Sequence, residues 1–238
     1  MSIQLAIVMD PIGSIKIHKD SSFAMLLAAQ ARGWTLLYTE QQNLFLRDGE
    51  AFAMTRSVEV RDQAGDWFKL GEPEELRLGE LDVILMRKDP PLDMEFIYTT
   101  HLLEQAERAG ALVVNRPSAL RNCNEKLFAA QFPDCCAPNL VSRDPARLRG
   151  FLDKYGDIIL KPLDGMGGAS IFRIQADDPN ISVILETLTA LGQRTAMAQQ
   201  FIPEISAGDK RILMVDGEPV PYALARIPAK GETRGNLA

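Results

Sequence analysis

Residues 158–172 read Ile-Ile-Leu-Lys-Pro-Leu-Asp-Gly-Met-Gly-Gly-Ala-Ser-Ile-Phe, and they are the most informative segment for the fold of the second half of the chain. A strand expected over 157–160 leads into Lys161, a loop with three glycines follows, and a second strand is expected over 169–174. Glycine lets backbone N–H groups approach an anion closely, and the lysine adds a point charge. The stretch therefore predicts a loop that closes over phosphate groups, with a plain glycine-rich hairpin beside a solvated lysine as the alternative.

This loop differs from two common phosphate-binding motifs. It is no Walker A loop, because no Gly-Lys-Ser/Thr follows it, and it is no dinucleotide fingerprint, because a strand rather than a helix comes next. Few helices are expected around it, which favours an α+β arrangement. The expected helices are 125–132 and 145–155 (capped by Asp144), and the further strands are 196–201, 211–215 and 220–227, with Asp216-Gly217 as a hairpin turn.

The first 120 residues instead alternate between strand and helix patterns. A helix is expected from about Ser22, with Ser21 or Ser22 as its cap and Gly33 as its stop. This alternation predicts a doubly wound, mostly parallel α/β sheet, so we expect an N-terminal lobe at 1–120 and a second lobe at 121–238. The expected elements are strands 3–9, 34–38, 81–86 and 112–114, a hairpin of 44–47 and 51–54 around Asp48-Gly49, and a helix containing Phe96, Thr99, Leu103 and Ala106 that ends at Gly110.

Composition excludes several classes of protein. The 238 residues include 26 Lys and Arg against 32 Asp and Glu, so the net charge of −6 argues against binding to nucleic acid or an anionic membrane. The longest uncharged run, 21–31, is much shorter than the ~20 residues of a membrane helix, and 3–9 reads as a buried strand rather than a signal peptide. The odd cysteine count of 3 suits a reducing compartment, and we expect a cytoplasmic protein.

Histidine and cysteine contribute little chemistry. His18 and His101 are too few for a histidine metal site or a Ser-His-Asp triad, and we expect both to be partly exposed. Cys123 lies near Lys126 and is expected to be a small buried filler, with a reactive thiol as the alternative.

The order strand, Lys-Pro, glycine-rich loop, strand resembles the nucleotide-binding half of the ATP-grasp ligases. With six further motifs it resembles the bacterial glutathione synthetase family along the whole chain. These motifs are Val-Met-Asp-Pro at 8–11, Lys-Asp-Ser-Ser-Phe-Ala-Met-Leu at 19–26, Met-Arg-Lys-Asp-Pro-Pro at 86–91, Cys-Asn-Glu-Lys-Leu-Phe at 123–128, Gly-Asp-Lys-Arg at 208–211 and Glu-Thr-Arg-Gly-Asn-Leu-Ala at 232–238.

The resemblance implies ATP-dependent joining of γ-glutamylcysteine to glycine through an acyl phosphate, with release of ADP and phosphate. It also implies Mg²⁺ (or Mn²⁺) and a homo-oligomer, a tetramer in intact family members. A ligase for another carboxylate and amine is the enzymatic alternative.

The resemblance assigns roles to particular residues. The implied phosphate ligands are Lys126, Lys161 and the N–H groups of Gly165, Gly167 and Gly168, and the implied hinge that recognises adenine is Gln200, Phe201 and Ile202. Asp209 would contact nucleotide or metal-bound water. Arg211 and Arg226 would hold the transferring phosphate and the oxyanion, and Arg234 would lie in a loop that closes over the intermediate. The alternatives without a binding role are a solvated first-turn lysine for Lys126 and a core strand for the hinge segment.

Three further features keep two interpretations each. Arg87 either clamps a substrate carboxylate or belongs to a structural charge cluster with Lys88 and Asp89. The 20–22 segment, Asp-Ser-Ser, either binds peptide or caps a helix. The bond before one of the prolines at 90–91 is a candidate for the cis form.

The metal-binding strands of this family are expected after its Arg-Gly-Asn-Leu-Ala segment, and hence beyond residue 238. One hypothesis is a ligase whose C-terminal segment is absent from this sequence. The other is an inactive fragment that binds nucleotide or partners the intact enzyme. In both cases we expect the 238-residue chain alone to be nearly inactive.

Overall fold

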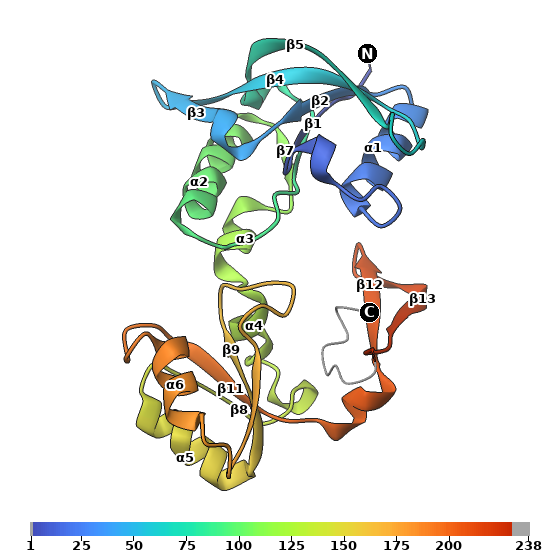
Figure 1. Cartoon of the computed structure of the whole chain (residues 1–238). Helices are drawn as coiled ribbons and strands as arrows, with labels where there is room; N and C mark the ends of the chain where they lie inside the picture. Colours follow the sequence, from blue (N-terminus) through green and yellow to red (C-terminus); the bar gives the residue numbers. More distant parts are fainter. Residues whose placement is uncertain (1, 230–238) are drawn as a thin grey trace. The chain divides into compact units, whose positions relative to one another are not determined.

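The computed structural model describes residues 2–229 (Figure 1). The chain divides between Cys123 and Asn124 into two compact units, called here the first and the second unit. Each unit is described by itself.

The described part of the first unit is built on a seven-stranded sheet. Strands β2, β1, β6 and β7 are parallel neighbours in that order, and β4 joins β2 antiparallel and carries β3 and β5. The strands are β1 (Gln4–Val8), β2 (Thr35–Thr39), β3 (Leu44–Arg47), β4 (Glu50–Val60), β5 (Phe68–Arg77), β6 (Val83–Met86) and β7 (Leu112–Val114), and the helices are α1 (Ser21–Ala31), α2 (Met94–Ala109) and α3 (Pro117–Asn122).

Helices cover both faces of this sheet, which confirms the doubly wound architecture. Successive residues of β1 point to opposite faces: Ala6 and Val8 pack in the core that includes α2, whereas Leu5 and Ile7 pack in the core that includes α1. Figure 1 shows the two helices on opposite sides of the sheet. Burying each such aliphatic side chain contributes about 1.5–3 kcal/mol.

Several local predictions for the first unit can be compared with the structure. The cap of α1 is Asp20, whose side chain accepts a hydrogen bond from the Phe23 amide, so the choice of Ser21 or Ser22 was wrong and the capping interpretation of this segment is confirmed. The Asp48-Gly49 hairpin is confirmed, with φ of 51° and 85° at its two central residues. Strand β5 was not predicted, because its sequence is rich in charge and contains Pro73.

The second unit has a four-stranded antiparallel sheet of order β10-β9-β11-β8 and a separate two-stranded ribbon within its described residues. Helices α5 and α6 share one hydrophobic core on one face of the four-stranded sheet (Figure 1). The strands are β8 (Asn139–Ser142), β9 (Asp157–Pro162), β10 (Phe172–Gln175), β11 (Ala196–Gln200), β12 (Asp209–Val215) and β13 (Glu218–Arg226), and the helices are α4 (Glu125–Ala129), α5 (Pro145–Tyr155) and α6 (Ile181–Thr189).

The sequence misjudged parts of the second unit. Strand β10 begins at Phe172, not residue 169, and α4 ends at Ala129, not residue 132. Helix α6 was missed because its β-branched residues favour strand; its apolar residues Ile181, Leu185 and Leu188 keep helical spacing and dock on the sheet. The expected α5 and its Asp144 cap are confirmed, whereas α3 and β8 were not predicted.

Candidate functional site

One face of the four-stranded sheet of the second unit is left free by α5 and α6. Along β9 and β11 the side chains of Leu160 and Ala198 enter the helix-covered core. Because neighbours along a strand alternate, Lys161 and Gln199 lie on the opposite face. There the Lys161 Nζ donates a hydrogen bond to Gln199 Oε1 at 2.8 Å. This face, carried by residues 157, 159, 161, 173, 175, 197 and 199, is called the open face below.

The glycine loop follows Lys161 directly. Gly167 and Gly168 have positive φ of 65° and 78°, a conformation that residues with a Cβ rarely adopt. A Cβ at Gly167 would meet no atom within 4 Å, whereas one at Gly165 would lie 3.1 Å from Pro162 Cγ. The loop is therefore tight at its start and open around Gly167, where backbone N–H groups can meet an anion.

Helix α4 brings a second lysine to the same loop. Asn124 caps the helix by accepting from the amides of Lys126 and Leu127, and its Nδ2 donates to the Leu163 carbonyl at 3.1 Å. Lys126 Nζ donates to the Gly165 carbonyl at 2.8 Å, and its side chain is only 13% exposed. The structure therefore brings Lys126, Lys161 and the glycine loop together.

The electrostatic surroundings favour an anion at Lys161, whereas Lys126 Nζ already pairs with Glu125 Oε1 at 2.7 Å. Burial, and then repulsion from the Lys126 charge, lower the pKa of Lys161 below its ordinary value of 10.5. A bound polyanion would offset both effects because it attracts the protonated form of each lysine. The donor set therefore fits a phosphate chain.

This pKa shift predicts how nucleotide binding depends on pH. A phosphate prefers protonated Lys161, so ATP binding should be coupled to proton uptake and should weaken as pH rises through the lowered pKa. Lys161→Arg keeps its charge to higher pH, so its affinity for ATP should decline less between about pH 7 and pH 10. Calorimetric titrations at several pH values check this, and identical declines in both proteins would contradict it.

The expected hinge residues lie at the end of β11, where Gln200 is the last residue of the strand and Phe201 and Ile202 follow it. The Phe201 amide donates to the Asp157 carbonyl at 3.1 Å and the Gln200 amide to the Pro138 carbonyl at 2.9 Å. Ile202 is 52% exposed, and within residues 2–229 its amide has no backbone hydrogen-bond partner. The segment thus combines two anchored amides with one that is available to a ligand.

The β12–β13 ribbon carries two of the expected arginines. Arg226 Nε donates to Asp209 Oδ1 at 2.7 Å, and a second bond joins its NH2 nitrogen to Asp209 Oδ2. The register pairs Asp209 with Arg226 and Arg211 with Leu224, so Arg211, which is exposed, shares their face of the ribbon. Arg234 lies outside the described residues.

In the first unit, charged residues gather where β1 and β6 end. Lys88 Nζ is 2.9 Å from Asp10 Oδ1, and Asp10 Oδ2 accepts from the Asp89 amide, which supports the structural charge cluster. Arg87 lies outside these contacts and donates from Nε to Ser22 Oγ at 3.1 Å in the first turn of α1. Because β1 and β6 are adjacent parallel strands whose crossovers lead in opposite directions, this edge is where α/β sheets bind ligands.

A hollow of about 320 Å³ lies beside β2 in the first unit. Its wall includes Tyr38, whose hydroxyl donates to Glu40 Oε1 at 2.6 Å; burial, followed by this hydrogen bond, raises the tyrosine pKa. The group is held as a neutral hydrogen-bond donor, which suits a structural role.

Other sequence expectations have clear outcomes. His18 and His101 are exposed, as expected, whereas Cys123 is also exposed and is therefore not a buried filler. The peptide bond between Pro90 and Pro91 is cis. No helix among residues 2–229 has both the length and the apolar character needed to cross a membrane.

The described residues do not fit a divalent-cation site by themselves. Among residues 2–229 there is no group of three or more His, Cys, Asp or Glu side chains placed to hold a metal. Asp209, the acidic residue expected near the nucleotide, is paired with Arg226 instead.

Known families account for nearly the whole chain. Residues 3–121 match the family described as prokaryotic glutathione synthetase, N-terminal domain, and residues 125–238 match prokaryotic glutathione synthetase, ATP-grasp domain. The chain belongs to the prokaryotic glutathione synthetase family. Membership of this family implies ATP-dependent synthesis of glutathione.

Curated relatives agree with the family match. Glutathione synthetase of Pseudomonas putida is 66% identical over 238 residues, which are 100% of this chain and 75% of the relative. The enzymes of Pseudomonas aeruginosa and Yersinia pestis are 64% and 62% identical and are covered to 75% and 74% of their length. The chain thus spans about three quarters of these glutathione synthetases.

Solved structures share the fold. D-cycloserine synthetase DcsG superposes with a TM-score of 0.61 at 15% identity, covering 95% of this chain and 72% of that one. The ATP-grasp ligase PsnB, solved with a precursor peptide and AMPPNP, gives 0.54 at 21% identity, covering 94% of this chain and 72% of that one. At these identities the likeness establishes the ATP-grasp fold alone.

The sequence missed the partners of the expected residues. Gln199, which accepts from Lys161, lies in the expected strand 196–201, and Asn124, which ties α4 to the loop, lies in the motif at 123–128, but neither was assigned a role. Alternation along β11 could have placed Gln199 on the face of Lys161 once the pairing of the two strands was known. Nothing in the linear order reveals that pairing.

Proposed function

We propose that the open face binds ATP, with its phosphates held by Lys126, Lys161 and the N–H groups of Gly165, Gly167 and Gly168. The observation that carries this proposal is the pair of poorly exposed lysines at the glycine loop, of which Lys161 precedes the loop and Lys126 donates to the Gly165 carbonyl. The AMPPNP in the solved PsnB complex is consistent with a nucleotide site in this fold. The adenine would meet the hinge, Gln200–Ile202, at the amide of Ile202.

The chemistry proposed for this site is carboxylate activation. A carboxylate is a poor electrophile, so the γ-phosphoryl group of ATP is first transferred to it, and an amine then displaces phosphate through a tetrahedral intermediate. Arg211 and Arg226 are proposed to stabilise the transferring phosphoryl group and the oxyanion, and Arg234 to close over the acyl phosphate and limit its hydrolysis. Since both carboxylate oxygens of Asp209 contact Arg226, we assign Asp209 to holding this arginine.

The proposed substrates are γ-glutamylcysteine and glycine, which glutathione synthesis joins. All reactants bring negative charge, so a locally basic site is needed in a chain whose net charge is −6. Mg²⁺ (or Mn²⁺) is proposed to accompany ATP, with ligands outside the described residues. A cytoplasmic location and a tetrameric assembly are proposed from the family resemblance.

The test is phosphate release from ATP by the purified protein. Release should require γ-glutamylcysteine and glycine together, with glutathione formed in equal amount. Other carboxylate and amine pairs, including D-alanine with itself, should give less than about a hundredth of that rate, a difference of about 2.7 kcal/mol in transition-state binding. Faster turnover of another pair would favour the alternative ligase.

The length of the polypeptide is a second variable in this assay. Because the chain spans 75% of its relatives, we propose that a polypeptide limited to these 238 residues binds ATP but turns over slowly. A polypeptide extended to the relatives' length should be much faster. Equal rates for the two would refute the proposed fragment-like behaviour while leaving the family assignment intact.

A further inference from the structure

Arg173 makes an unusual set of contacts on the open face. Its Nε donates to Asp157 Oδ1 at 3.0 Å and its NH2 nitrogen to Asp157 Oδ2 at 2.6 Å, forming a two-pronged pair across β10 and β9. The guanidinium carbon also lies 3.7 Å from the centre of the Phe201 ring. The carboxylate therefore fixes the plane of the guanidinium while its face covers the first residue after β11.

These contacts link Asp157, Arg173 and Phe201 to one another. The Asp157 backbone carbonyl accepts from the Phe201 amide at 3.1 Å, and the Asp157 side chain holds the arginine that covers the Phe201 ring. Gln175 Nε2 adds a bond to Asp157 Oδ2 at 3.1 Å. Both the backbone and the side chain of Phe201 are thus held by groups of β9 and β10.

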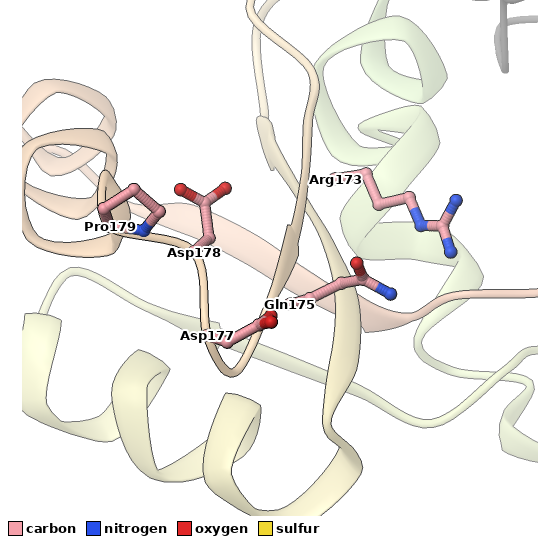
Figure 2. Close-up of a pocket in the computed structure, with 5 residues that line it drawn as sticks. All are labelled: Arg173, Gln175, Asp177, Asp178 and Pro179. Atoms are coloured by element: carbon pink, nitrogen blue, oxygen red, sulfur yellow. The ribbon is translucent and has the colours of Figure 1, made fainter.

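Arg173 also lines a hollow of about 330 Å³ beside β10. Figure 2 shows the side chains that line it: those of Arg173 and Gln175 extend to one side of the strand, whereas the Asp178 carboxylate and Pro179 lie on the other. The arginine is therefore directed away from Asp178 and contacts Asp157 and Phe201.

Ile202 follows Phe201 in the chain, and its amide has no backbone hydrogen-bond partner within residues 2–229. An amide can recognise a ligand atom only if its direction is held, since misplacement by about 1 Å weakens such contacts strongly. We propose that Arg173 and Asp157 clamp Phe201 and so are positioning residues for the nucleobase of ATP. This inference rests on the proposed placement of adenine at the hinge.

The clamp acts on the base and not on the phosphates. Asp157 lies four residues before Lys161 on β9, which corresponds to about 13 Å of strand. Loss of the clamp should therefore weaken ATP binding while leaving binding of inorganic tripolyphosphate, which lacks a base, unchanged. A general loss of protein stability would weaken the binding of both ligands to the same extent.

The experiment uses Arg173→Ala and Asp157→Asn in the whole chain, titrated with ATP and with tripolyphosphate in the same buffer. We expect ATP affinity to fall about three- to tenfold and tripolyphosphate affinity to stay within about twofold. Arg149→Ala is the matched control, because Arg149 forms an exposed pair with Asp153 at 3.4 Å on α5, outside the hinge. Arg173→Lys keeps the charge without the flat guanidinium and should give an intermediate loss.

Hydrogen exchange separates failure of the clamp from failure of the nucleotide site. In Arg173→Ala without ligand, the amide of Phe201 should exchange about three- to tenfold faster than in the unchanged protein and in Arg149→Ala. Unchanged exchange at Phe201 would overturn the clamp itself. Faster exchange at Phe201, together with an equal loss of affinity or no loss of affinity for both ligands, would show that the clamp holds the segment but that the segment does not bind the base.

Discussion

Lys161→Ala is expected to weaken ATP binding by about 10- to 100-fold, the effect of removing a charged hydrogen-bond donor worth about 1.5–3 kcal/mol. Lys161 is the lysine that precedes the glycine loop, and its side chain points to the open face rather than into the core. Its partial burial makes the loss larger than for a solvated lysine, because water screens the attraction between a partly buried charge and a phosphate less. Titration calorimetry of the 238-residue chain and its Lys161→Ala variant with ATP measures this loss of affinity.

Arg87→Ala is the matched control for this prediction. It also removes one positive charge, but from the first unit, where Arg87 contacts Ser22. Its ATP affinity should stay within about threefold of the unchanged protein, a difference below ~0.7 kcal/mol. Equal losses in the two variants would mean that ATP is attracted by overall charge, and the site on the open face would be refuted.

Leu160→Ala is expected to lower the free energy of unfolding of the second unit by about 2–5 kcal/mol. Leu160 is fully buried in the core shared by α5 and α6, next to Lys161 in the sequence. Removing its side chain leaves a cavity that two helices and a sheet cannot readily close. Both tryptophans, Trp34 and Trp67, belong to the first unit, so the second unit is followed in urea by hydrogen exchange of β9 and β11 peptides.

The same substitution at an exposed leucine provides the control. Leu213 on β12 is 61% exposed, and Leu213→Ala should change stability by less than about 0.5 kcal/mol. The comparison also tests the register of β9, because a slip of one residue would exchange the environments of Leu160 and Lys161. Similar effects of the two substitutions would contradict the described core and with it the orientation of Lys161.

Several features could be predicted from local sequence patterns. Asp48-Gly49 and Asp216-Gly217 specify their hairpins because both central residues of each turn adopt positive φ. The glycines after Lys161 predicted a loop because they permit positive φ, which Gly167 and Gly168 adopt, and Asp144 caps α5 through its own side chain. Family membership likewise followed from motifs spread along the chain, which the matches over residues 3–121 and 125–238 confirm.

The misjudged elements share a physical cause. Strand β5 is rich in charge yet pairs with β4 along most of its length, and α6 is rich in β-branched residues yet is helical. In each, tertiary contacts override local preference, since pairing or packing against a preformed neighbour outweighs differences of well under 1 kcal/mol per residue.

Sequence patterns alone were enough to predict the family, the glycine loop, the two hairpin turns and the residue types that the chemistry needs. Which residues contact one another depends on the folding of the chain. It placed Lys126 on the loop that follows Lys161, tied Arg226 to Asp209, and closed Arg173 over Phe201. These contacts join residues 17 to 39 positions apart, and strand pairing and helix docking, rather than any local pattern, set their distances.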